Sequence, residues 1–310
     1  MTIDFLVNAL VAVLVNSLLA AGLYATMSYG LAVIYGVMRI INLAHAGILM
    51  LGAYATLTLN SRFGLDPFLS LAAVIPIFFG LGIVLYLAMV RRLPRSSTGP
   101  SIESLLLLFG VWLVLQNLAY AIWGGDTQSI LTRYTMKSVV LFGVRVGVPT
   151  IAVFAVSAAS LVVLQVILRW TYLGRAIRAV TQNRDAAMLS GVNADRISAV
   201  AFGIGTAFAA AAGSLLATMY AFTPDFGRSF LLKSFCIIVL AGMESVAGVA
   251  AGAFVLALLE NVVGGYTTLP TSFQDALSFT LLVVALVAFP QGLVGAFSRA
   301  ANRWRRLRKA

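Results

Sequence analysis

Long runs of apolar residues alternate with short polar segments along most of the chain. Such runs are predicted to be helices that cross a membrane, because lipid offers no partners for unpaired backbone groups. With about 20 residues needed for each crossing, the chain holds roughly eight to ten membrane segments. The first run is too long for one simple span. We therefore expect an all-α fold, a polytopic transmembrane helical bundle whose apolar runs cover residues 5–37, 46–60, 68–90, 103–123, 148–170, 198–222, 232–264 and 274–295.

The composition agrees with a membrane protein and excludes a soluble globular domain. Hydrophobic residues make up 61% of the 310 residues and charged residues 10%, whereas charged residues are about a quarter of a soluble domain. The mean hydropathy is +1.00. Because the chain has one cysteine, Cys236, and one histidine, His45, neither a disulfide framework nor a Cys/His metal cluster is expected.

The net charge of +11 comes mostly from three basic segments. Fourteen of the 21 lysine and arginine residues lie at 91–95, 169–196 and 298–310. Nucleic acid is one class of partner for such a charge, but membrane proteins gather basic residues in cytoplasmic loops. The pattern therefore predicts membrane lipid and no nucleic acid as the partner, with these three segments and the C-terminus in the cytoplasm. The loops at 124–147 and 223–229 are then outside.

Two parts of the chain contain sequences that predict a broken helix. From the second outer loop to a cytoplasmic C-terminus the chain must cross the membrane an odd number of times, yet only the runs 232–264 and 274–295 remain. A break in the Gly-rich stretch 241–252, which contains Glu244, resolves this conflict, and its two halves form either a re-entrant hairpin or two crossings. A similar break is expected at 35–47. Discontinuous helices of this kind mark transport sites in many carriers.

Polar residues near the two breaks are candidates for the lining of a solute path, namely Tyr35, Asn42, His45, Glu244 and Glu260. Polar groups at membrane depth are expensive and usually face a bundle interior or a cavity. Asn42 and His45 are three positions apart and share a face if this segment is helical. They form either a satisfied packing network or the lining of a path or gate. Glu260 either reaches the membrane interface near a helix end, or lies in a path or a buried pair.

Small residues at four-residue spacing predict close contacts between helices. They are Gly205, Ala209 and Gly213 in one run and Gly248 and Gly252 in another. We expect these residues to serve packing rather than transport.

The segment at about 171–197 is polar, although long apolar runs flank it on both sides. It is expected to be cytoplasmic, with one surface helix that starts with Gly174 and stops at a turn at Gly191. Asn193 then begins a new helix, with Asp195 in its first turn. A surface helix of this kind either lies among lipid headgroups or docks a cytoplasmic partner.

The sequence DAAMLSG at 185–191 resembles the EAA motif of ABC importer permeases, with an acid, two alanines, three further residues and a glycine. In that superfamily this helix docks into a groove of the ATPase subunit. The resemblance implies an ATPase-coupling role for Arg184, Asp185, Ala186, Ala187, Gly191 and Asn193.

Further short motifs occur in the order found in the Liv-type permeases for branched-chain amino acids, and the chain resembles that family over nearly its whole length. Two differences stand out. HAG at 45–47 lacks the acid of the family's His-Gly-Glu, and Ala247 stands at the family's proline position, after Glu244. The motifs are NLAHAG and MLGAY within 42–54, LQN at 115–117, GRAIRA at 174–179, GVNADR at 191–196 and FPQGLVG at 289–295.

The resemblance implies a single transmembrane permease domain over residues 1–310 in a bacterial inner membrane. Its partners would be a second, homologous permease, two cytoplasmic ATPase subunits and a periplasmic solute-binding protein. The sequence has no Gly-Lys dipeptide and so no phosphate-binding loop of that type. ATP and Mg²⁺ are therefore expected on the ATPase, with no cofactor and no enzyme activity in this chain. The expected solute is leucine, isoleucine or valine; the alternatives are urea, amides or another small solute, an ion-coupled secondary transporter, and a membrane enzyme.

Overall fold

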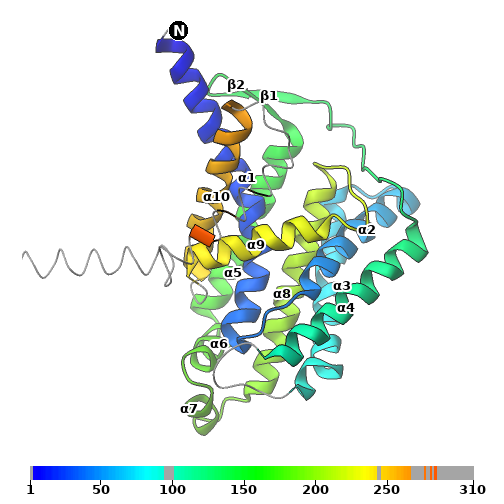
Figure 1. The fold of residues 1–310 in the computed structure, drawn as a ribbon, viewed down its shortest axis with the longest axis vertical. Helices are drawn as coiled ribbons and strands as arrows, with labels where there is room; N and C mark the ends of the chain where they lie inside the picture. The colour runs from blue at the N-terminus through cyan, green and yellow to red at the C-terminus, as the bar shows by residue number, and fades with distance from the viewer. Residues whose placement is uncertain are drawn as a thin grey trace, which may run out of the picture.

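The computed structural model describes residues 3–93, 101–242 and 246–266, together with four single positions between 276 and 284. This part of the chain is a bundle of helices with one hairpin of two short strands (Figure 1). The predicted all-α fold is confirmed. The elements are α1 (Ile3–Met38), α2 (Ala44–Phe63), α3 (Pro67–Ala88), the 3-10 turn η1 (Val90–Arg92), α4 (Ile102–Trp123), β1 (Ser138–Leu141), β2 (Val144–Gly147), α5 (Val148–Trp170), α6 (Tyr172–Gln182), α7 (Arg184–Leu189), α8 (Ala194–Ala217), α9 (Gly227–Ala241) and α10 (Val246–Tyr266).

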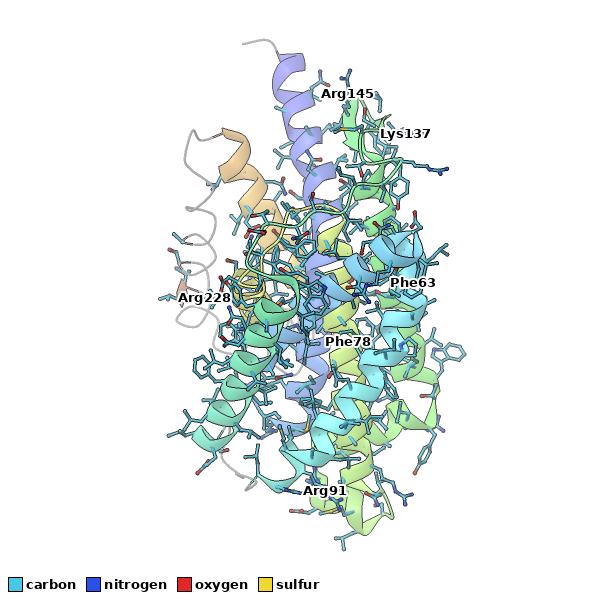
Figure 2. The ribbon with its side chains drawn as sticks, turned by 90° about the vertical axis from the view of Figure 1, so that its right-hand side faces the viewer. Phe63, Phe78, Arg91, Lys137, Arg145 and Arg228 are labelled. Carbon is cyan, nitrogen blue, oxygen red and sulfur yellow. The ribbon has the colours of Figure 1, made fainter. Side chains whose placement is uncertain are left out.

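Five of the described helices, α1, α3, α4, α5 and α8, are long and apolar enough to cross a membrane. Two of the three segments expected on the cytoplasmic side, 91–95 and 169–196, contact each other, since Arg91 Nε is 3.3 Å from Asp195 Oδ2 at the start of α8. The third, 298–310, lies outside the described residues. The two loops expected outside also meet, because the backbones of Gln128 and Phe222 exchange hydrogen bonds of 2.8 and 2.9 Å. Figure 2 shows Arg91 at one end of the bundle and Arg145 at the other. The total of about eight to ten membrane segments stays a prediction.

The first apolar run forms one continuous helix, α1, of 36 residues. This helix is longer than the roughly 20 residues that one crossing needs, which agrees with the expectation that the run is too long for one simple span. α1 ends where Arg39 adopts a positive φ of 54°, and α2 begins at Ala44 without a side-chain cap. The break predicted within 35–47 is confirmed at residues 39–43.

Helix α8 is the centre of the bundle, and 89% of its most apolar 18-residue stretch is buried. It packs against α1, α2 and α3. The predicted close packing at small residues is confirmed, because a β-carbon on Gly205 would meet the Gly30 carbonyl oxygen, and one on Gly213 would overlap the carbonyl oxygen of Leu49. These helices touch backbone to backbone, which requires glycine at the contacts.

The run 232–264 is interrupted as expected, since α9 ends at Ala241 and α10 begins at Val246. Gly242 follows α9 with a φ of 85°, a conformation that glycine adopts without steric cost. α9 lies across the other helices in Figure 1 and is seen nearly end-on in Figure 2. Of the two arrangements considered for this run, the orientation of α9 agrees with the re-entrant one and not with two crossings.

The segment 171–197 contains two short helices before α8, and the expectation of one surface helix is wrong. α6 ends at Gln182, and the Asn183 side chain accepts a hydrogen bond of 3.0 Å from the Ala186 backbone N–H, which starts α7. The expected turn at Gly191 is confirmed by its φ of 84°, and Asn193 caps α8 by accepting from the Arg196 N–H at 3.0 Å. The apolar face of α6 packs against α1, α5 and α8, so this face is not available to lipid.

Candidate functional site

The first break brings two buried polar side chains to the start of α2. Asn42 and His45 are both fully buried. His45 Nε2 lies 2.9 Å from the carbonyl oxygen of Met27 on α1. Asn42 precedes α2, so the two residues do not share a helix face as expected. They are nevertheless adjacent, because the His45 N–H donates to the Asn42 carbonyl at 3.3 Å. Tyr35 lies half-buried in the last turn of α1.

The polar atoms at this break are not all satisfied. Among the described residues, neither the amide nitrogen nor the amide oxygen of Asn42 has a hydrogen-bond partner, and neither does His45 Nδ1. Leaving a buried polar group without a partner costs about 1–3 kcal/mol. The packing alternative supposed a satisfied network, and Asn42 does not fit it. An unpaired amide inside the bundle is more consistent with a group that meets water or solute when the helices move.

Glu260 lies in a buried ion pair rather than at the membrane interface. Its carboxylate oxygens are 3.1 and 3.2 Å from Lys233 Nζ on α9, and the Tyr24 hydroxyl on α1 donates to Oε2 at 2.5 Å. The Lys233 and Glu260 side chains are 9% and 7% exposed. The cluster joins α1, α9 and α10 and compensates each charge inside the bundle.

The sequence interpretation missed Lys233. The sequence contains the feature that could have identified it, since Lys233 is the single charged residue within FLLKSFCII at 230–238. An isolated charge in an apolar run needs a partner. Its Nζ also lies 5.4 Å from the ring centroid of Tyr24 and 5.8 Å from that of Phe230. The fifth candidate for the path, Glu244, falls outside the described residues.

Helix α7 is fixed to the rest of the bundle through its first residue. Arg184 NH2 is 3.0 Å from Asp195 Oδ1, and Arg184 NH1 donates to the Ser198 hydroxyl at 3.3 Å. Arg91 contacts the other oxygen of the same carboxylate. Asp195 therefore joins α7 to the start of α8 and to η1, the turn that follows α3.

The exposed face of α7 is not the one expected. The resemblance implied that Ala187 contacts the ATPase, but it is 5% exposed and packs against its own chain. Ala187 is buried because it lies on the side of α7 that faces the bundle, whereas Asp185 and Ala186 lie on the exposed side. The largest exposed apolar side chain of α7 is Leu189, at 91%. Any partner of this helix would meet Leu189 and not Ala187.

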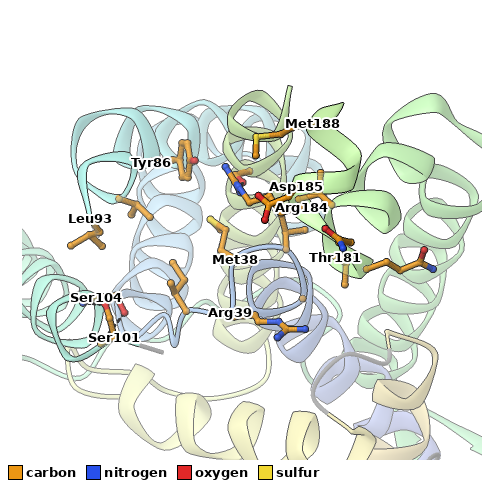
Figure 3. Close-up of a pocket in the computed structure, with 18 residues that line it drawn as sticks. Met38, Arg39, Tyr86, Leu93, Ser101, Ser104, Thr181, Arg184, Asp185 and Met188 are labelled. Atoms are coloured by element: carbon orange, nitrogen blue, oxygen red, sulfur yellow. Dashed lines mark hydrogen bonds between the residues drawn. The ribbon is translucent and has the colours of Figure 1, made fainter. Parts of the chain in front are cut away.

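A cavity of about 460 Å³ lies between the first break and α7. The end of α1 and the break supply residues 36–40 of its wall, and Arg184 and Asp185 of α7 also line it. Figure 3 shows Met38 close to these two α7 side chains. The two segments that the sequence marked separately, a break in the bundle and a surface helix, thus share one cavity at the end of the bundle that carries α6 and α7.

Broken helices with polar groups inside an apolar bundle are typical of membrane transport proteins. The sequence profile of the family described as "branched-chain amino acid transport system / permease component" matches residues 13–286. The chain belongs to this family, and it is a multi-pass permease subunit of a transporter.

Individual relatives agree with this family. The chain is 28% identical to the high-affinity branched-chain amino acid transport system permease protein LivH of Escherichia coli over 293 residues, which cover 90% of this chain and 94% of LivH. It is 29% identical to the corresponding protein BraD of Pseudomonas aeruginosa, over 91% and 94% of the two chains. A shorter match, 33% identical, covers 37% of this chain and 31% of the xylose transport system permease protein XylH of Escherichia coli. No solved structure matches.

Proposed function

We propose that this chain is the translocation subunit of an ABC importer in a bacterial inner membrane, with its C-terminus in the cytoplasm. A separate ATPase would bind ATP and Mg²⁺ and hydrolyse the nucleotide, and this chain would hold no cofactor. A second permease, two ATPase subunits and a periplasmic solute-binding protein would complete the assembly. The observation that supports this function best is the cavity whose walls include both the first break and α7.

The coupling would start at the exposed face of α7, around Leu189. ATP-driven closure of the ATPase subunits would shift α7, and the Arg184–Asp195 ion pair would transmit that shift to α8. Because α8 packs against α1 and α2, both sides of the first break would move with it. A cavity with a movable wall can open a path to one side of the membrane at a time.

The proposed solute is leucine, isoleucine or valine, on the strength of the matches to LivH and BraD over nine-tenths of the chain. The short match to XylH keeps other small polar solutes as the second candidate, with urea and amides among them. An ion-coupled secondary transporter is less well supported. A proton relay needs a carboxyl group that can cycle between charged and neutral forms, and Lys233 already compensates Glu260.

Replacement of Leu189 by aspartate tests the proposed dock. Leu189 is 91% exposed, so the change leaves the packing of the chain intact while it puts a charge in an apolar contact. Loss of one central contact typically costs about 2 kcal/mol of binding, or roughly 30-fold in affinity. We expect Leu189→Asp to insert normally and to lose ATPase co-purification and solute-stimulated ATP hydrolysis. The matched control is Phe142→Asp, since Phe142 is 84% exposed in the β1–β2 turn.

Equal recovery of the ATPase with wild type and Leu189→Asp, at equal membrane levels, would remove the support for the dock. Uptake of labelled leucine by the reconstituted complex tests the solute. An assembly that hydrolyses ATP but takes up urea or xylose in place of leucine would keep the transporter class and reject the proposed solute.

A further inference from the structure

Four polar residues lie on the outer part of the bundle, on a surface where lipid contact would be costly. Gln116, Asn117 and Tyr120 belong to α4, and Asp225 belongs to the loop before α9. Gln116 Nε2 donates to Asp225 Oδ1, and the Tyr120 hydroxyl donates to Oδ2. Asp225, Asn117 and Tyr120 are exposed. Gln116 lies seven residues before the end of α4 at Trp123, which is about 10 Å along a helix. This surface therefore faces water or protein rather than hydrocarbon.

A second observation points to a ligand at the same place. The Tyr54 side chain on α2 is fully buried, and among the described residues its hydroxyl has no hydrogen-bond partner. The Tyr54 ring packs against Phe222, which lies three residues before Asp225 in the chain. A buried hydroxyl without a partner is a group that water or a bound molecule can satisfy.

Aromatic rings form a wall beside this carboxylate. The Tyr54 ring centroid is 4.9 Å from that of Trp123 and 5.1 Å from that of Phe222. Phe226 continues the row at 5.5 Å from Phe222. Tyr54 and Phe222 are fully buried, whereas Trp123 and Phe226 are half-buried. The two half-buried rings offer apolar contact area to an aliphatic chain, and aromatic faces attract cations.

The carboxylate of Asp225 still has room for a cationic ligand. A carboxylate offers about four acceptor positions, and Gln116 and Tyr120 use one on each oxygen. Within the described part of the chain no lysine or arginine forms an ion pair with Asp225, in contrast to Asp195 and Glu260. The site therefore combines a negative charge, free acceptor capacity and an apolar wall.

We propose that Asp225 binds the α-ammonium group of the solute at the outer mouth of the translocation path, with the aliphatic side chain of the solute against the half-buried rings of Trp123 and Phe226. This inference rests on the proposed function and deepens it. It assigns the α4 surface with Gln116 and Asn117 to the water-filled path. The ligand class is a zwitterion with an aliphatic side chain.

The first test measures charge and water at this surface without any transport. Cys236 is replaced by serine, and Asn117→Cys is treated in membranes with a cationic and an anionic methanethiosulfonate reagent. We expect the cationic reagent to react several-fold faster, and the ratio of the two rates to fall toward one when Asp225→Asn is added. Leucine should slow the reaction in the presence of Asp225. Leu106→Cys on the same helix, at a 65% exposed position, is the control expected to face lipid and to stay unreactive.

The second test measures transport by the complete reconstituted complex. Asp225→Asn should lower kcat/KM for leucine roughly 10- to 100-fold, the value of one hydrogen bond to a charged group, while ATPase co-purification stays unchanged. Asp225→Glu should restore part of the activity. Three results would each overturn the proposal. Asn117→Cys could fail to react, Asp225→Asn could leave the ratio of the two reagent rates unchanged, or Asp225→Asn could take up leucine like the wild type. If the wild-type complex moves no leucine, the proposed function fails, and the reagent ratio still decides whether Asp225 faces water.

Discussion

Removal of one charge of the Lys233–Glu260 pair is expected to destabilise the protein strongly, whereas removal of both charges is not. Lys233→Met leaves the Glu260 carboxylate buried without its counter-ion, and Glu260→Gln leaves the Lys233 ammonium buried in the same way. The double variant is neutral, and the glutamine oxygen can still accept the hydrogen bond from the Tyr24 hydroxyl that Glu260 accepts at 2.5 Å.

The magnitude follows from the burial of the pair. Both side chains are less than one-tenth exposed, and breaking a buried ion pair by removing one partner typically costs about 3–5 kcal/mol. At about 2 °C per kcal/mol for a chain of this size, each single variant should melt about 6–10 °C below wild type. The double variant leaves only a buried amide group unsatisfied, which costs about 1–3 kcal/mol, so it should melt at a higher temperature than either single variant.

The assay is thermal unfolding of the detergent-solubilised protein, followed by tryptophan fluorescence and by retention of the monodisperse peak in size-exclusion chromatography. The wild type and the three variants form a double-mutant cycle, which isolates the interaction between the two residues. Single variants that melt like wild type, or a double variant whose loss equals the sum of the two single losses, would refute the compensated buried pair.

Two further predictions concern packing and the path. Gly213→Ala should reduce the yield of folded protein severely, because the added β-carbon would overlap the backbone of α2. The control is Gly110→Ala on α4, where an added β-carbon meets nothing within 4 Å and the change should be neutral. The yield of each variant is measured by size-exclusion chromatography of the protein fused to a fluorescent protein. Asn42→Leu removes an unpaired buried amide, so it should leave the melting temperature unchanged or higher while leucine uptake falls by about 10-fold or more, the effect of one lost polar contact. Uptake equal to that of wild type would assign Asn42 to packing alone.

The local chemistry of the chain was predictable wherever one residue decides the backbone. Gly191 adopts the left-handed turn and Asn193 caps α8, as glycine and asparagine do in such positions. The interruption after Ala241 followed from counting crossings. The helix start at Asn183 could also have been predicted, since asparagine favours the start of a helix. It was missed because the residues on both sides of Asn183 are good helix formers, which favours one continuous helix.

The long-range arrangement was not predictable in the same way. The burial of Ala187 depends on how α7 rotates about its own axis, and six residues of helix carry too little periodic pattern to fix that rotation. The pairing of Lys233 with Glu260 joins positions 27 residues apart across a break. Hydropathy gives each run a length but no direction in space, so it could not tell that α9 lies across the bundle.

The central position of α8 has a consequence for the synthesis of this protein. α1, α2 and α3 pack around α8, yet α8 comes later in the chain, and the 105 residues from 89 to 193 separate it from α3. At about 5–20 residues per second, the ribosome needs roughly 5–20 s to make that stretch. During this time the glycine-lined faces of α1 and α2 have no native neighbour to receive them. Early helices that have entered the lipid cannot form their native contacts until α8 is made. We therefore expect this permease to depend on insertion machinery that retains the early segments until α8 emerges.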